Sequence, residues 1–197
     1  MKKRDIKGAI VRLLPIIVIS LVLIVYNVIV NYDSITSKKI LEILMNATLA
    51  GVGEELIFRK ILLGFMLKKN EDKYITYIII CGALFGVVHL SNLFYGAPVV
   101  DVICQVIAAS MAGIMFGFVY YNSRSFILCA LIHTLYDIAA LMSTIGGQET
   151  SMQVIIETVI ITALVSTIIA AFISKKKNIQ NILLALGIIL AFTIILV

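Results

Sequence analysis

Both histidines of the chain and several of its few carboxylates lie inside long apolar stretches. They form three short clusters, Glu54-Glu55-Leu-Ile-Phe-Arg59, Phe85-Gly-Val-Val-His89 and His133-Thr-Leu-Tyr-Asp137. If these stretches cross a bilayer, each ionisable group at membrane depth costs about 2.5–3.5 kcal/mol on insertion scales. Such a cost favours a chemical role, and a carboxylate with an imidazole suits general acid–base catalysis on a water molecule.

The first cluster predicts one ion pair and one carboxylate without an obvious partner. Residues four apart share one face of a helix, so Glu55 and Arg59 are expected to form an ion pair. Glu54 points about 100° away from Glu55 around the helix and has no evident cation. Glutamates of this kind can also simply bind basic groups between helices. We favour that supporting role for Glu55 and a catalytic role for Glu54.

The second and third clusters each place a histidine one helical turn from an informative neighbour. Phe85 lies on the same face as His89 and can shield its imidazole from water. His89 by itself fits a catalytic role and an interhelical hydrogen bond about equally well. In the third cluster, Asp137 can accept a proton from His133 and fix its tautomer, or the two side chains can merely satisfy each other.

Together, Glu54, His89 and His133 can converge from three helices and polarise a water molecule in two ways. They can ligate a divalent metal such as zinc. Alternatively, Glu54 and His89 hold the water as general base and orienter, with His133 near the developing oxyanion. The spacing does not decide between these mechanisms, and the HExxH pattern of soluble zinc proteases does not occur.

The elements that must position these groups are transmembrane helices. Of the 197 residues, 61% are hydrophobic and only 14% are charged, with a mean hydropathy of +1.11. Several apolar runs reach the roughly 17–25 residues that a membrane helix needs. We therefore expect an all-α fold, a polytopic transmembrane helical bundle of about seven spans. The expected segments are 10–30, 40–67, 74–92, 99–121, 125–144, 153–173 and 179–197.

The whole chain, residues 1–197, is expected to form a single membrane domain with a motif-bearing catalytic core at about residues 42–141. Gly51, Gly53 and Gly86 lie beside the motif residues, where small side chains permit close approach of helices. Gln105, within the fourth segment, is expected to hydrogen-bond between helices rather than to catalyse.

Basic residues gather at the ends of apolar runs, and the positive-inside rule then places the N-terminus in the cytoplasm and the C-terminus outside. No arginine-rich face is present to follow phosphates, so nucleic acid is not an expected partner. The composition is rich in Ile, Lys and Asn, which suits an AT-rich bacterial genome. We expect a multi-pass protein of a bacterial cell membrane, with the lipid bilayer as its surroundings.

The three clusters, in this order and inside apolar helices, resemble the CPBP family. This family includes CAAX-processing proteases and the bacteriocin-processing or bacteriocin-immunity proteins called Abi. Its pattern is EExxxR, then FxxxH, then HxxxN or HxxxD, and the match covers about half of the chain. The resemblance implies an intramembrane endopeptidase in which Glu54 and His89 activate water and His133 with Asp137 stabilises the oxyanion. The residues that would support this site are Glu55, Arg59 and Phe85.

Asp137 departs from the asparagine form of the motif. An amide can donate a hydrogen bond to an oxyanion, whereas an ionised carboxylate would repel it. Asp137 must therefore either be protonated, which burial favours, or act by orienting His133, and we favour the second role. The resemblance admits a metal-dependent and a metal-free glutamate mechanism. We favour the second and expect no cofactor, the alternative being a zinc ion held by Glu54, His89 and His133.

The first hypothesis for function is therefore a protease of a hydrophobic or lipidated peptide or protein, acting in bacterial peptide maturation or bacteriocin self-immunity. An alternative is a non-proteolytic membrane scaffold or immunity protein that has kept the motifs. A small transporter that uses the same groups as a proton relay ranks last, because no inverted repeat is evident.

Overall fold

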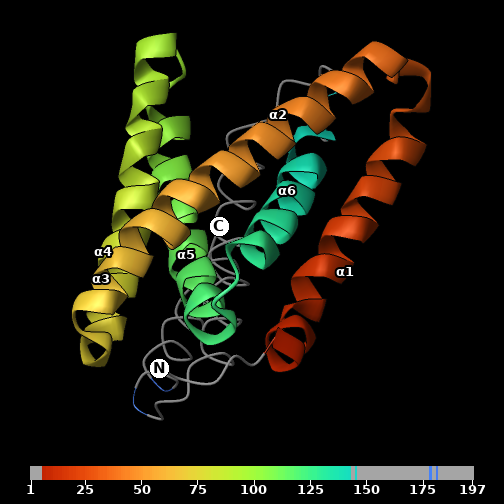
Figure 1. The fold of residues 1–197 in the computed structure, drawn as a ribbon. Coiled ribbons are helices and arrows are strands. Elements are labelled where there is room, and N and C mark those ends of the chain that lie inside the picture. The colour runs from red at the N-terminus through yellow and green to blue at the C-terminus, as the bar shows by residue number, and fades with distance from the viewer. Residues whose placement is uncertain (1–5, 143–144, 146–177, 179–180, 182–197) are drawn as a thin grey trace.

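The computed structural model describes residues 6–142, Ile145, Asn178 and Asn181, and all regular structure in this part of the chain is helical (Figure 1). The long helices are α1 (Ile6–Val30), α2 (Ser37–Glu55), α4 (Tyr74–Val87), α5 (Val99–Ser123) and α6 (Phe126–Met142). Two irregular helices interrupt them. The π-helix η2 (Leu56–Leu63) joins α2 to the short α3 (Gly64–Lys69), and the 3₁₀-helix η4 (Val88–Tyr95) extends α4. Short 3₁₀ turns, η1 (Tyr32–Ser34) and η3 (Glu71–Lys73), lie in the connections.

The expected membrane segments are matched in part. Each of the first five coincides with a helix or a nearly continuous helical run. Two runs, Glu71–Tyr95 and Val99–Ser123, are long and apolar enough to cross a membrane by length and composition. The expected segments 153–173 and 179–197 lie outside the described residues. The all-helical class is therefore confirmed for the described part, and the count of seven spans stays a prediction.

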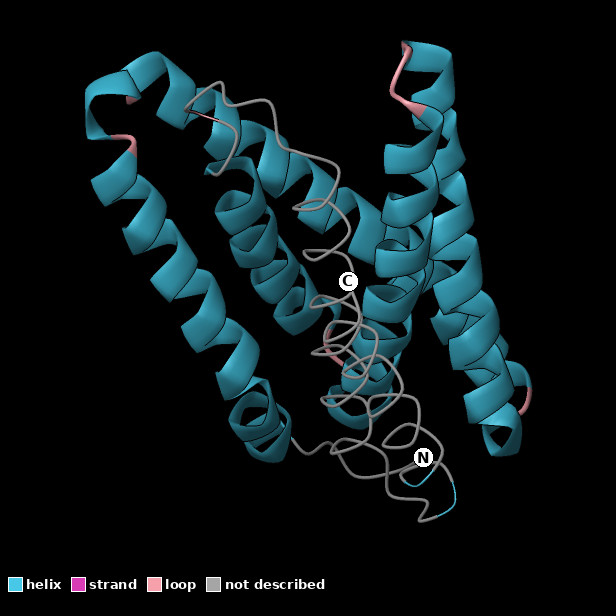
Figure 2. Ribbon diagram, turned by 180° about the vertical axis from the view of Figure 1, so that it is seen from behind, coloured by secondary structure: helices cyan, strands magenta, loops and turns pink. Residues whose placement is uncertain are grey.

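The helices form two groups that diverge from one end of the molecule (Figure 1, Figure 2). In one group α4 packs along α5, and η4 also contacts α5. In the other group α2 packs along α6, which also contacts α1. The π-helix η2 contacts α4, α5 and α6, so the two groups meet where the Glu54–Arg59 cluster lies.

Glycine makes the close contact between α4 and α5 possible. A Cβ atom on Gly86 would lie 1.9 Å from the Ser110 Oγ and 2.5 Å from the Val106 carbonyl oxygen. A Cβ atom on Gly113 would lie 2.9 Å from the Cα of Gly82. Two of these contacts are with backbone atoms, which cannot rotate away as a side chain can. The helix axes can therefore approach this closely only because these positions carry no side chain.

A glycine also sets the contact between α2 and α6. A Cβ atom on Gly51 would lie 2.5 Å from the Thr134 Oγ1 and 2.8 Å from the Thr134 backbone nitrogen. The predicted role in helix approach is thus confirmed for Gly51 and Gly86. It is wrong for Gly53, where a Cβ atom would meet nothing within 4 Å. Gly51 and Gly53 are two residues apart, so on a helix they point to opposite sides, and only one can face α6.

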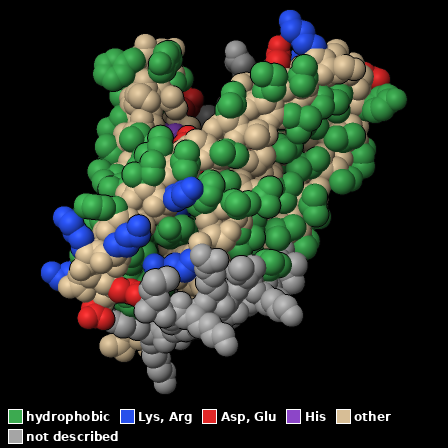
Figure 3. All heavy atoms as spheres, in the orientation of Figure 1, with side chains coloured by type: hydrophobic (Ala, Val, Ile, Leu, Met, Phe, Trp, Pro, Cys, Tyr) green, Lys and Arg blue, Asp and Glu red, His purple; other side chains and the backbone are tan. Residues whose placement is uncertain are grey.

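The hydrophobic core lies where the two groups meet. Its buried side chains come from α1, η2, α3, α4, α5 and α6, and include Leu13, Leu63, Ile78, Met115, Phe116 and Cys129. The outer surface is also apolar, with hydrophobic side chains covering most of the face shown in Figure 3. Exposed apolar area on this scale is solvated by lipid rather than by water. Exposed lysines gather around α3, at Lys60, Lys68, Lys69 and Lys73.

Arg124 connects the loop after α5 to the loop after α3, at the end of the molecule where the exposed lysines gather. It forms an ion pair with Glu71, and its guanidinium carbon lies 5.0 Å from the centre of the Tyr121 ring. Arg124 also ends α5 in the left-handed conformation, with φ of 55°. The loops after α3 and α5 therefore lie at the same end, as the distribution of basic residues predicts. The assignment of that end to the cytoplasm remains a prediction.

Candidate functional site

A cavity of about 530 Å³ lies between the two diverging helix groups. Its lining includes side chains from α2, α4, η4, α5 and α6, and holds all four predicted catalytic residues: Glu54, His89, His133 and Asp137. The other lining side chains are Asn46, Ala47, Ala50, Phe85, Asn92, Gln105, Ala108, Ala109, Ala112, Tyr136, Ala140 and Leu141. Glu54 and Asp137, more than 80 positions apart in the sequence, therefore line the same cavity. Much of the remaining lining consists of alanine side chains from α2, α5 and α6.

The end of α2 sends its two neighbouring glutamates in different directions. Glu54 lines the cavity, and its side chain is 32% exposed. Glu55 is fully buried at 0% exposure. Successive helical residues point about 100° apart, so one carboxylate faces the cavity while the next enters the core. The π-helix η2 begins immediately afterwards, and turns of this kind often occur at functional sites.

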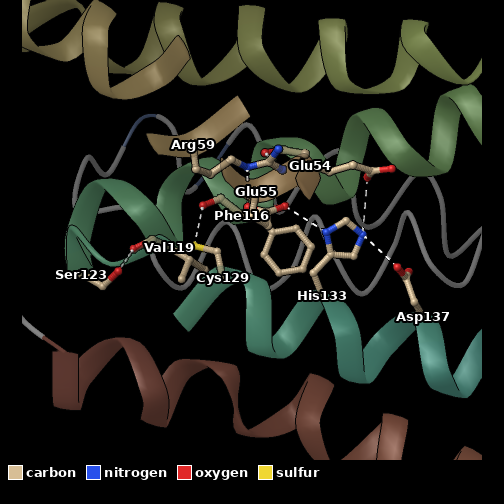
Figure 4. A network of polar contacts seen from close by, with 10 residues as sticks. Glu54, Glu55, Arg59, Phe116, Val119, Ser123, Cys129, His133 and Asp137 are labelled. Atoms are coloured by element: carbon tan, nitrogen blue, oxygen red, sulfur yellow. Dashed lines mark hydrogen bonds and ion pairs between the residues drawn. The ribbon is translucent and has the colours of Figure 1, made fainter. Parts of the chain in front are cut away.

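The Glu55 carboxylate contacts two buried side chains, those of Arg59 and His133 (Figure 4). Its Oε2 lies 3.0 Å from the Arg59 Nε, which confirms the predicted ion pair, although the two groups are not aligned for a hydrogen bond. Its Oε1 lies 3.0 Å from the His133 Nδ1, 78 residues further along the chain. Because Glu55 has both partners, its negative charge is compensated in the core. The bond to His133 was not predicted from the sequence.

Arg59 is buried, with 1% of the residue exposed, and its guanidinium lies against a backbone carbonyl and aromatic rings as well as Glu55. Its Nη2 donates to the Gly113 carbonyl oxygen at 3.3 Å, and its Cζ lies 4.5 Å from the centre of the Phe85 ring. The Phe116 ring centre is 5.6 Å away. Aromatic faces of this kind stabilise a desolvated cation. Phe85 therefore shields the buried charge as well as the imidazole of His89.

His133 is clamped between aromatic rings with each nitrogen facing a carboxylate. Its ring stacks on Phe116 with 5.2 Å between centroids, and Phe85 approaches edge-on at 5.7 Å. On the cavity side, Nε2 lies 3.8 Å from the Glu54 Oε2 and 3.5 Å from the Asp137 Oδ2. An ionised Glu55 can only accept, so the His133 Nδ1 donates to it and Nε2 is the nitrogen presented to the cavity.

His89 approaches the cavity from the other helix group. Its Nδ1 lies 2.9 Å from the Phe85 carbonyl oxygen. A carbonyl oxygen only accepts, so Nδ1 carries the proton and the neutral ring keeps its lone pair on Nε2. Among the described residues, His89 forms no direct hydrogen bond or ion pair with Glu54. The bond to its own helix also replaces the interhelical hydrogen bond that was the alternative expectation for His89.

The chain from residue 36 to residue 139 matches the family model described as type II CAAX prenyl endopeptidase Rce1-like. This match spans more than half of the chain and contains all three clusters. The chain belongs to this Rce1-like family. The resemblance to CPBP proteins is thereby confirmed, and with the apolar helices it makes the chain a membrane protein. No curated protein and no solved structure matches the chain.

The cavity also contains a polar residue, Asn92, that lies outside the three sequence clusters. Asn92 of η4 lines the cavity and donates through Nδ2 to the Gln105 Oε1 of α5 at 2.7 Å. The predicted interhelical hydrogen bond of Gln105 is therefore present, but it lies inside the candidate site. The signal for Asn92 is its position three residues after His89, which places both on one face of a 3₁₀-helix.

The expected metal ligands Glu54, His89 and His133 all line the cavity without forming a compact ligand set. The His133 Nδ1 is bound to Glu55, which leaves Nε2 as the nitrogen that could bind a metal, 3.8 Å from a Glu54 oxygen and 3.5 Å from an Asp137 oxygen. Within the described chain, no group of three or more His, Cys, Asp or Glu side chains is arranged to hold a metal ion. As placed, the described side chains do not form a metal site, and the choice between a metal-free and a metal-dependent mechanism stays a prediction.

Proposed function

We propose that this Rce1-like protein is an intramembrane endopeptidase that hydrolyses a peptide bond in a hydrophobic or lipidated peptide or protein. The observation that carries the proposal is the shared cavity. Four groups suited to peptide hydrolysis, Glu54, His89, His133 and Asp137, line one chamber between apolar helices in a chain of a CAAX endopeptidase family. A shielded cavity with a base and a site for the oxyanion is what hydrolysis of a peptide bond requires.

Glu54 and His89 activate the attacking water from opposite sides of the cavity. The Glu54 carboxylate takes one proton of the water, and the His89 Nε2 accepts a hydrogen bond from the other. The hydroxide oxygen then bonds to the carbonyl carbon, whose oxygen becomes the oxyanion. When this intermediate collapses, the C–N bond breaks and Glu54 returns its proton to the leaving nitrogen. The carboxylate is thereby restored for the next cycle.

His133 stabilises the oxyanion through the nitrogen that faces the cavity. Because Nδ1 already carries the proton that it donates to Glu55, Nε2 donates only when the ring is doubly protonated, and Glu54 and Asp137 are the acceptors beside it before substrate arrives. Asp137 orients the imidazole from one turn along α6. Glu55 fixes the opposite nitrogen and is itself fixed by Arg59. A donor held in place before the reaction is worth more than one that must reorganise.

The biological setting that we propose is the cell membrane of a bacterium, with the N-terminus in the cytoplasm. The support is the composition of the chain and its pattern of basic loops. The substrate would be a precursor peptide in maturation or a bacteriocin-related peptide in self-immunity. Lipid and this substrate are the expected partners, and nucleic acid is not.

The test is cleavage of hydrophobic precursor peptides by the purified protein in detergent. Wild type is compared with Glu54→Ala and His89→Ala, each with and without a chelator. The matched control is Glu42→Ala, because Glu42 lies on the same helix and is exposed. We expect cleavage by wild type and the control, retained with chelator, and loss in both cavity variants.

Other outcomes of this assay contradict specific parts of the proposal. Cleavage that chelator abolishes and zinc restores would replace the metal-free mechanism by a metal-dependent one. Cleavage that survives both substitutions would refute the assignment of Glu54 and His89. If wild type cleaves none of the peptides, the non-proteolytic scaffold becomes the better hypothesis.

A further inference from the structure

The cavity contains a second polar group that hydrolysis of the peptide bond does not use. Asn92 and Gln105 face each other from η4 and α5, with 2.7 Å between the Asn92 Nδ2 and the Gln105 Oε1. Both line the chamber that holds Glu54 and His89. They come from the helix group that carries His89, whereas Glu54 and His133 come from the other group.

The Asn92–Gln105 pair presents one donor and one acceptor side by side. Each side-chain amide has one oxygen and one NH₂ group, and their mutual bond uses one of each. The Asn92 oxygen and the Gln105 NH₂ group then remain available to the cavity. Exchanging the oxygen and nitrogen positions of both amides leaves the same combination. A donor next to an acceptor is complementary to a peptide group, which carries one N–H and one C=O.

The 3₁₀ geometry of η4 sets the distance of this pair from the reacting groups. His89 and Asn92 are three residues apart on a helix with three residues per turn, so they lie on one face. A rise of about 2.0 Å per residue separates them by about 6 Å along the helix axis. An extended peptide advances about 3.3 Å per residue, so this distance corresponds to about two residues of substrate.

The wall between these points suits an extended main chain. Ala108, Ala109 and Ala112 follow Gln105 at helical spacing on α5, and all line the cavity. Alanine leaves room for a peptide to lie against the helix and offers no polar group that competes for its backbone. The polar contacts on this face of the cavity are therefore concentrated at the Asn92–Gln105 pair.

We propose that Asn92 and Gln105 bind the substrate's peptide group about two residues from the scissile bond. The inference rests on the proposed function and adds to it a subsite that reads the main chain rather than a side chain. Such a subsite holds the substrate in register with Glu54 and His89. Asn92 and Gln105 are positioning residues and take no part in bond cleavage.

The experiment combines variants of the protein with backbone-modified substrates. A hydrophobic peptide that wild type cleaves is made in versions with a single N-methyl group at each position near the scissile bond. Steady-state kinetics are measured for wild type, Asn92→Ala, Gln105→Ala and the control Ser91→Ala, which changes an exposed residue of the same 3₁₀-helix outside the cavity lining.

We expect each amide variant to raise KM about three- to tenfold, the range for one net hydrogen bond, while kcat changes little. N-methylation two residues from the scissile bond should impair wild type and Ser91→Ala by a similar factor. The same modification should have little further effect on Asn92→Ala, because the Asn92 oxygen that accepts from this substrate N–H is already absent. Gln105→Ala removes the donor to the substrate carbonyl instead, so N-methylation should still impair that variant.

Two results would overturn the subsite while leaving the protease intact. One is that, at every methylated position of the substrate, the loss of activity caused by N-methylation is as large in both amide variants as in wild type. The other is that the amide variants have a lower kcat with KM unchanged. A wild-type protein that cleaves none of the unmodified peptides would instead refute the proposed function, and the subsite with it. Thermal unfolding of each variant in detergent separates these results from a loss of folded protein.

Discussion

Replacing Glu55 by glutamine removes the charge that holds the site's buried groups together. Glu55 is fully buried between Arg59 at 3.0 Å and the His133 Nδ1 at 3.0 Å. Glutamine has nearly the same shape but cannot neutralise Arg59, whose guanidinium is 1% exposed. Breaking a buried ion pair in this way costs about 3–5 kcal/mol. We expect Glu55→Gln to lower the free energy of unfolding by that amount and to abolish peptide cleavage.

The double variant Glu55→Gln with Arg59→Met separates charge from shape. Methionine fills part of the arginine volume without a charge, so no unpaired ion remains in the core. We expect the double variant to regain at least half of the lost stability, because buried pairs replaced by neutral groups are often nearly as stable. Cleavage should stay low, since the His133 Nδ1 no longer faces a carboxylate.

The measurements are unfolding in mixed detergent and peptide cleavage on the same preparations. The exposed pair of Lys38 and Glu42, 3.9 Å apart, supplies the control. Glu42→Gln should change stability by no more than about 1 kcal/mol, as exposed pairs do. The single variant Arg59→Met completes the comparison. If the effects of Glu55→Gln and Arg59→Met simply add in the double variant, the two charges are independent and the predicted coupling is refuted.

Three further predictions concern packing, backbone and cavity volume. Gly86→Ala should destabilise the protein by about 1–3 kcal/mol, because the new Cβ would lie 2.5 Å from a carbonyl oxygen of α5. In the control Gly53→Ala the new Cβ meets no atom within 4 Å, so this variant should be neutral or stabilising. Thermal unfolding of the two variants tests the difference. The Arg124→Gly protein should be more stable than the Arg124→Ala protein by about 1 kcal/mol. Both variants lose the ion pair with Glu71, but only alanine is strained at φ of 55°. Equal unfolding temperatures of the two variants would contradict this prediction. Ala109→Leu should block peptide cleavage without loss of folded protein, because the larger side chain fills part of the cavity. The control Ile107→Leu, on the exposed face of α5, should leave cleavage unchanged. Normal cleavage by Ala109→Leu would show that the substrate binds outside this part of the cavity.

The sequence was sufficient for the contacts that depend on one helix alone. The pairs Glu55 with Arg59 and His133 with Asp137 follow from residues four apart sharing a face, and both are present. The hydrogen bond between Glu55 and His133 crosses from α2 to α6 and could not be predicted in this way. Its length depends on how closely those helices approach, which the contact between Gly51 and Thr134 determines.

The irregular helices are the other part of the site that apolar periodicity does not predict. A period of 3.6 residues predicts continuous helices through both motifs, yet η2 begins directly after Glu55 and η4 directly before His89. Each changes the number of residues per turn at a motif. The sequence therefore located the motif residues correctly in helices, but not the directions in which later residues such as Asn92 point.

The division of the cavity between two helix groups has a consequence for catalysis. Glu54, His133 and Asp137 lie on α2 and α6, whereas His89, Asn92 and Gln105 lie on η4 and α5. One group thus carries the proposed general base and oxyanion donor, and the other carries the proposed water orienter and main-chain contact. A substrate between them contacts both groups, and these contacts set which of its peptide bonds lies between Glu54 and His89. Removing the Asn92–Gln105 contact should therefore have its largest effect on short peptides, which have few other contacts to hold them in register.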